Sequence, residues 1–219
     1  MKNMGISLSH LSIDYYESIM RNLEESSISL VEIYYAGLEK PSQFWEKIKN
    51  IQINLNSIHC RKDLFFLPKE YVIEYMKNLI FLRGKIPDNV FFLFHPNKNA
   101  RYYISYLQEL QNVAIENTIP GIESLLDFVY SNNFYLVYDV AHANYFGGQF
   151  ELIHDERLIY IHLKGYRESK NCLLRNSDMK HTEILSKLPD NKTYILEYPY
   201  NSINEMYQDI FFVKKYFRR

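Results

Sequence analysis

The stretch LVYDVAHANYFGG, residues 136–148, decides the fold and raises the question of function. Leu136, Val137 and Tyr138 predict a buried strand, which ends at the carboxylate of Asp139. His142 follows three residues later, where the chain turns away. A carboxylate at the edge of an apolar core costs solvation free energy unless a partner compensates it. The partner is therefore either a structural base or a metal ion with its substrate.

Seven similar runs of β-branched and aromatic residues recur along the chain and alternate with amphipathic segments. Helical spacing of apolar residues predicts helices over 68–84, over 118–133 and from Ser202 onward. Eight strands, each followed by a helix-sized segment, predict an α/β fold of the (β/α)8 TIM-barrel type, compact with short loops, as one domain over 1–219. The expected strands are 5–8, 30–35, 52–59, 90–95, 113–117, 134–139, 158–164 and 193–198.

The competing architecture is an open, doubly wound sheet that binds a nucleotide. That fold needs a glycine-rich turn after the first strand. The corresponding segment, SLSHLSID at 7–14, contains no glycine. The barrel is therefore favoured.

Composition and charge give no support to several classes of partner. The 219 residues carry a formal net charge of −1, which gives no electrostatic argument for binding nucleic acid or an anionic membrane. No apolar run approaches the ~18 residues of a membrane span. The N-terminal residues lack the apolar core of a signal peptide, and two cysteines, Cys60 and Cys172, fit reduced thiols better than a disulfide framework. These features predict a cytoplasmic protein that does not bind membranes.

Residues that bind metals or move protons fall at the carboxyl ends of the predicted strands, where TIM barrels carry their chemistry. Two Glu, one Asp and one His that converge there would repel one another unless a divalent cation neutralised them. Oxygen ligands with one imidazole suit Mn²⁺, Mg²⁺, Co²⁺ or Fe²⁺, and further histidines favour Zn²⁺. Glu32, in mid-strand, is interpreted as an internal pair and left out. The candidates are His10, His59, His95, Glu116, Asp139, His162 and Glu197.

Several short motifs, in order along the chain, resemble those of the xylose-isomerase-like barrels. They are SIH at 57–59, FHPN at 94–97, AIENT at 114–118, YDVAH at 138–142, IHLKG at 161–165 and ILEYP at 195–199. That superfamily contains sugar and sugar-phosphate isomerases and epimerases, and the endonuclease IV group (AP endonuclease family 2). The resemblance covers nearly the whole chain and implies the superfamily rather than a particular member.

The resemblance to the epimerase branch implies roles for individual residues. Glu116, Asp139, His162 and Glu197 resemble its four metal ligands, and its two glutamates also pass a proton to and from the carbon beside a carbonyl. His142, Lys164 and Arg167 resemble its substrate-binding residues, and His10 joins them as a candidate. The implied function is a metal-dependent isomerase or epimerase of a small sugar or sugar-phosphate-like polyol.

The endonuclease IV group implies an alternative, a multinuclear-zinc phosphodiesterase acting on abasic-site DNA. There, His59, His95 and Glu116 resemble one zinc site, and Glu116 bridges to a second that contains Asp139, His162 and Glu197. His142, Asp178 and His181 resemble a third. Here DMKH at 178–181 is one residue longer than that group's Asp-x-His, and Gly165 replaces the Asp that follows Lys in many sugar-phosphate enzymes.

Two further alternatives remain open. One is a different multinuclear-metal chemistry on the same barrel, and the other is a barrel that has lost catalysis and serves as a binding protein. The near-neutral charge and short loops favour a small-molecule substrate over duplex DNA. The sequence predicts no oligomeric state.

Overall fold

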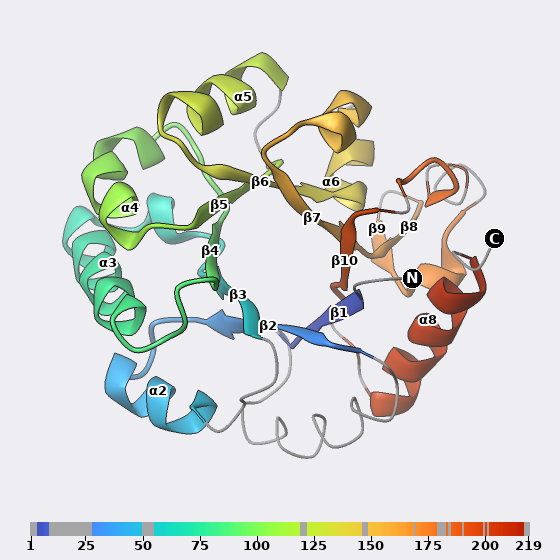
Figure 1. The fold of residues 1–219 in the computed structure, drawn as a ribbon, viewed down its shortest axis with the longest axis horizontal. Coiled ribbons are helices and arrows are strands. Elements are labelled where there is room, and N and C mark those ends of the chain that lie inside the picture. Colours follow the sequence, from blue (N-terminus) through green and yellow to red (C-terminus); the bar gives the residue numbers. More distant parts are fainter. Residues whose placement is uncertain are drawn as a thin grey trace.

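The computed structural model describes residues 4–8, 28–49, 55–118, 122–145, 149–168, 170–178, 183, 185–189, 191–198, 200 and 202–216. Parallel strands close into a barrel in the order β1-β10-β7-β6-β5-β4-β3-β2, and the helices surround it (Figure 1). The predicted (β/α)8 barrel is therefore confirmed. The strands are β1 Met4–Ser7, β2 Leu30–Tyr35, β3 Leu55–Cys60, β4 Phe91–Phe94, β5 Val113–Glu116, β6 Tyr135–Asp139, β7 Leu158–Leu163 and β10 Thr193–Leu196.

The helices bury one apolar face each against the outside of the barrel. In α3, Val72, Tyr75, Met76 and Leu79 are buried at helical spacing. The three helices expected from periodicity are present as α3, α5 and α8. The α-helices are α2 Pro41–Ile48, α3 Lys69–Arg83, α4 Ile104–Leu110, α5 Ile122–Ser131, α6 Val140–Tyr145 and α8 Ile203–Tyr216, and the 3-10 turns are η2 Leu64–Phe66, η3 Ala100–Tyr103, η4 Phe150–His154 and η5 Leu174–Asn176.

The barrel interior has its own small apolar cluster, separate from the larger core between strands and helices. Its buried members are Leu93, Ala114, Val137, Tyr160 and Ile195, one from each of five neighbouring strands. Side chains two residues apart on a strand share a face. The residues two positions further along these strands therefore form the next level of the interior, and they are His95, Glu116, Asp139, His162 and Glu197.

One hairpin of the fold was not among the expected strands. A short antiparallel hairpin, β8 Gly165–Arg167 with β9 Lys170–Cys172, follows β7 and lies outside the barrel sheet. Its three-residue, mostly polar strands carry no periodic signal, which is why it was not predicted. Cys60, the residue after His59 on β3, is fully buried in the outer core. Among the described helices, none has the length and hydropathy needed to cross a membrane.

Candidate metal centre

Four of the sequence-predicted ligands meet at the carboxyl-terminal end of the barrel. Each offers one ligand atom, these atoms all lie within 4.8 Å of one another, and all four side chains are buried. His162 Nδ1 lies 3.5 Å from Glu116 Oε1 and 3.4 Å from Glu197 Oε2. Alternation along β5, β6, β7 and β10 thus brings together the predicted set Glu116, Asp139, His162 and Glu197.

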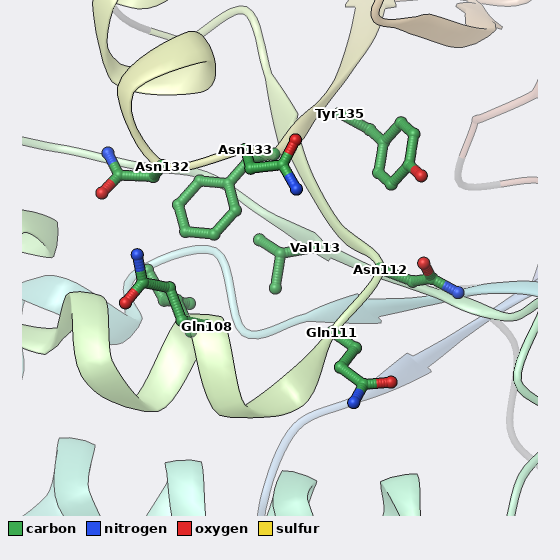
Figure 2. A pocket seen from close by; sticks show the side chains of 9 residues that line it. Gln108, Gln111, Asn112, Val113, Asn132, Asn133 and Tyr135 are labelled. Carbon is green, nitrogen blue, oxygen red and sulfur yellow. The ribbon is translucent and has the colours of Figure 1, made fainter.

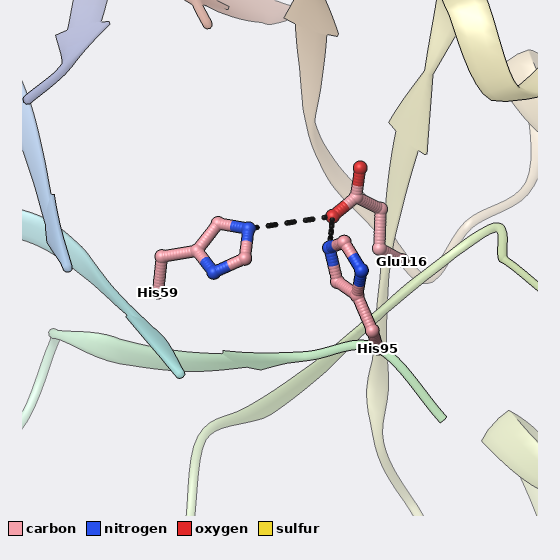
Figure 3. Close-up of side chains that lie close together, drawn as sticks. All are labelled: His59, His95 and Glu116. Atoms are coloured by element: carbon pink, nitrogen blue, oxygen red, sulfur yellow. Dashed lines mark ion pairs between the residues drawn. The ribbon is translucent and has the colours of Figure 1, made fainter. Parts of the chain in front are cut away.

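A second group shares Glu116 with the first. His59 and His95 both approach Glu116 Oε2, His59 Nε2 from 3.7 Å and His95 Nε2 in direct contact (Figure 3). The two imidazoles come from β3 and from the residue after β4, and their ring centroids lie 4.9 Å apart. Two nitrogens and one carboxylate oxygen form a ligand set that suits Zn²⁺ or Fe²⁺.

Several ligand atoms in these two groups are buried and, although they contact one another, make no hydrogen bond in the described part of the chain. They are His59 Nε2, His95 Nε2, both oxygens of Glu116 and His162 Nδ1. Buried polar atoms left without hydrogen bonds are rare and costly. Nitrogen and oxygen lone pairs that point into one small space are the donor set of a divalent cation, so the residues fit a metal ion.

Backbone capping holds Asp139 and His142 in place. Asp139 Oδ1 accepts hydrogen bonds from the backbone N–H groups of Ala141 and His142, at 2.7 and 2.9 Å, and so caps the start of α6. His142 Nδ1 lies 3.2 Å from Glu116 Oε1 and 3.9 Å from Asp139 Oδ2. The predicted His142 therefore borders the four-residue group, with about a quarter of its side chain exposed.

Comparison with known proteins supports the fold. No protein-family model and no curated protein sequence matches the chain. A xylose isomerase domain-containing protein from Salmonella typhimurium LT2 aligns with a TM-score of 0.66 and 12% identity over 99% of this chain and 97% of that one. The chain has the xylose-isomerase-like TIM-barrel fold.

Two further structures share this xylose-isomerase-like fold. A sugar phosphate isomerase/epimerase from Parabacteroides distasonis ATCC 8503 gives a TM-score of 0.60 at 10% identity, covering 98% of this chain and 93% of that one. An AP endonuclease, family 2, from Brucella melitensis gives a TM-score of 0.62 at 11% identity, covering 94% of this chain and 96% of that one. At such identities the likeness concerns the fold alone.

Within this xylose-isomerase-like barrel, two lysines neutralise part of the acidic centre. Lys164 contacts both Asp139 and Glu197, with its Nζ 2.9 Å from Glu197 Oε2. Lys62, in the β3–α3 loop, lies 3.0 Å from Glu197 Oε1. Burial alone would lower the pKa of Lys164. The negative charges of Asp139 and Glu197 outweigh burial and raise this pKa.

The histidines and carboxylates of the centre differ in charge. Burial lowers the pKa of His95 to about 4, so its ring is neutral near neutral pH and ready to bind a metal. Burial also opposes the charge of His162, but Glu32 and Glu197 raise its pKa well above 6.5. Burial would raise the pKa of Glu116, yet His95 and His142 hold it well below 4.5. Burial would also raise the pKa of Glu197. The positive charges of Lys164 and Lys62 outweigh this effect and hold the pKa well below its usual range.

Two further sequence candidates that the structure describes, Arg167 and Asp178, are not in these two groups. Arg167 lies on β8 with a mostly exposed side chain, 3.4 Å from Glu168. Asp178 donates its backbone N–H to Tyr166 O at 3.2 Å. His10 and His181 lie outside the described residues, so their predicted roles stay predictions.

Three residues that sequence reasoning passed over contribute directly to the centre. Lys62 stands in the charged run RKD, which is typical of a solvated loop. Asn117 hydrogen-bonds both backbone groups of Asp139, with Asn117 Nδ2 3.1 Å from the carbonyl oxygen and Asn117 Oδ1 2.6 Å from the nitrogen. Glu32 contacts His162. A carboxylate in the middle of the apolar run LVEIYY was the one available signal for Glu32.

A pocket at the opposite end of the barrel carries no comparable chemistry. It is bordered by side-chain amides near the starts of β5 and β6 (Figure 2). Asn132 Nδ2 already donates to Phe128 O at 2.8 Å, and Asn133 Oδ1 accepts from Arg157 Nη1 at 2.6 Å. The candidate centre is therefore at the carboxyl-terminal mouth.

Proposed function

We propose that the protein is a divalent-metal-dependent isomerase or epimerase that moves a proton next to the carbonyl of a small sugar or sugar-phosphate-like polyol. The observation that carries the proposal is the pairing of Glu116 and Glu197 around His162 Nδ1, together with Asp139, inside a buried site. Two carboxylates beside one cation site form an arrangement in which one can take a proton and the other return it.

The chain's own residues supply the acid–base chemistry. Glu116 and Glu197 have lowered pKa values and are ionised at neutral pH, so both can accept a proton. A bound divalent ion would polarise the substrate carbonyl and stabilise the negative charge that develops on its oxygen. Asp139, His162 and both glutamates would hold that ion. Lys164 and His142 border the same space and can donate hydrogen bonds to substrate oxygens.

A small substrate is favoured over a nucleic acid. Four buried carboxylates, Glu32, Glu116, Asp139 and Glu197, lie at or below the mouth, and the net charge of the chain is −1. Phosphodiester backbones are bound by clustered cations. The two lysines that the centre offers, Lys62 and Lys164, are both paired with Glu197.

One observation favours a second candidate, a multinuclear-metal enzyme such as a phosphodiesterase acting on abasic-site DNA. Glu116 belongs to both ligand groups, so it can bridge two cations. A bridged pair of cations is the arrangement that stabilises both the attacking and the leaving oxygen of a phosphoryl transfer. A different multinuclear chemistry would use the same groups.

Metal stoichiometry separates these candidates. Elemental mass spectrometry of the purified protein should find one exchangeable Mn, Mg, Co or Fe per chain, lost in Glu197→Ala and retained in Glu109→Ala, an exposed acid on α4. Two or three tightly held Zn or Fe ions would favour the second candidate, and cleavage of an abasic-site oligonucleotide would then be measured.

Activity is tested by hydrogen exchange. A panel of ketoses and aldoses, free and phosphorylated, incubated in D₂O with the metal-loaded protein should gain deuterium at the carbon next to the carbonyl, detected by NMR. Glu116→Gln should abolish the exchange. Absence of both bound metal and exchange in the wild-type protein would refute the proposal.

A further inference from the structure

Glu32 is a carboxylate buried inside the barrel below the candidate metal centre. It lies in the middle of β2 and has no exposed surface. Its Oε2 accepts hydrogen bonds from Ser57 Oγ at 2.8 Å and from Tyr160 OH at 3.0 Å, and it lies 3.2 Å from His162 Nε2. Ser57 is its register partner on β3, whereas Tyr160 and His162 belong to β7, which is not a neighbour of β2. Glu32 therefore reaches across the barrel interior.

The two ring nitrogens of His162 face different environments. Nε2 faces Glu32, whereas Nδ1 faces Glu116 and Glu197 at 3.5 and 3.4 Å. A neutral imidazole carries one N–H and one lone pair. A lone pair on Nε2 would repel the carboxylate of Glu32, whereas an N–H there donates a hydrogen bond to it. Nε2 makes a hydrogen bond to Glu32 Oε2 at 3.2 Å, whereas Nδ1 makes none with Glu116 or Glu197 among the described residues, so the geometry favours the proton on Nε2 and the lone pair on Nδ1.

Packing alone gives no reason for an acid at this position. A buried carboxylate loses its hydration, and an apolar residue would fill the same space without that cost. Both hydroxyl donors converge on the one oxygen that faces His162, and Oε1 has no hydrogen-bond partner in the described residues.

We propose that Glu32 is a positioning residue that holds His162 with its proton on Nε2, so that Nδ1 presents its lone pair to the metal centre. Carboxylates commonly orient metal-binding histidines in this way. Ser57 and Tyr160 fix the carboxylate in turn. The consequence for metal affinity rests on the proposed function, whereas the orientation of the ring does not.

The ring orientation is tested directly in the metal-free protein. ¹⁵N NMR of the histidine rings at alkaline pH, where His162 is neutral, reports which nitrogen carries the proton. We expect the Nε2–H form alone in the wild type. Glu32→Gln should populate both forms, because a carboxamide can either accept from or donate to Nε2, and Glu32→Leu should do the same. Glu109→Gln is the matched control, since it makes the same acid-to-amide change at an exposed position of α4.

Metal affinity provides the second readout, by calorimetric titration with Mn²⁺. Glu32→Gln should weaken binding about 10- to 100-fold, whereas Glu109→Gln should leave it unchanged. A folded Glu32→Gln variant with the wild-type tautomer and wild-type affinity would overturn the proposal. If the wild type binds no divalent ion, the metal-dependent function fails, and the NMR comparison alone decides whether Glu32 orients His162.

Discussion

The ammonium of Lys164 lies 2.9 Å from Glu197 Oε2 and occupies a carboxylate oxygen that a metal ion would also use. Lys62 Nζ forms an ion pair with the other oxygen of the same carboxylate, Glu197 Oε1, at 3.0 Å. Both ion pairs stabilise the acidic centre when it holds no divalent cation. A metal ion that binds Glu197 must therefore compete with two ammonium groups that belong to the chain itself.

Removing Lys62 is expected to tighten metal binding. Its side chain is 39% exposed, and ion pairs with such exposure contribute about 1 kcal/mol or less. Lys62→Met should therefore increase Mn²⁺ affinity about two- to fivefold, measured by isothermal titration calorimetry at constant ionic strength. Lys77→Met, which removes the same charge from the exposed face of α3, should leave the affinity unchanged. Weaker binding in Lys62→Met would show that the lysine supports the ion.

Metal affinity should rise with pH because the ion displaces a proton from His162. Burial alone would lower the pKa of this ring, but the negative charges of Glu32 and Glu197 outweigh burial and raise the pKa well above 6.5. Below that raised pKa Nδ1 is protonated, so the affinity should rise about tenfold per pH unit and level off above it. Mn²⁺ titrations at a series of pH values measure this slope. His154→Asn, a change at an exposed ring, should retain it, and a flat profile from 6.5 upward would contradict the displacement.

The positions of the four candidate ligands at the ends of the expected strands made them predictable. Glu116, Asp139, His162 and Glu197 each stand two residues after a buried apolar residue on their strand, so a local pattern places them in the barrel interior. The direction of the strands then places all four at one end. No contact between distant residues was needed for this inference.

Residues whose role depends on barrel closure could not be found in the same way. Glu32 is separated from Tyr160 and His162 by 128 and 130 residues, and its own strand carries no sign of either partner. Lys62 lies 135 residues from Glu197, in a charged run that is typical of a solvated turn. The hairpin β8–β9 is too short for any periodicity to predict it.

Asn117 is expected to stabilise the strand end that carries Asp139. Its amide donates to the carbonyl of Asp139 and accepts from the N–H of the same residue, and both groups are buried. Asn117→Ala leaves them unpaired and should reduce the free energy of unfolding by about 1–3 kcal/mol, measured by urea denaturation. Asn171→Ala, at an exposed position of β9, is the control. Equal effects of the two substitutions would refute this role for Asn117.

Gly165 is expected to tolerate no side chain, which accounts for the absence of an aspartate after Lys164. A Cβ atom at Gly165 would clash with Leu173 O and would lie 2.7 Å from Cys172 O, both of them backbone atoms of the returning hairpin segment. Gly165→Ala should therefore lower the free energy of unfolding by about 1–3 kcal/mol, and Gly165→Asp by more. Gly84→Ala is the matched control, because the nearest atom to its Cβ would be 3.6 Å away, at an ordinary contact distance. Thermal unfolding followed by circular dichroism measures the difference, and equal melting temperatures for the two alanine variants would mean that the hairpin yields to the added methyl group.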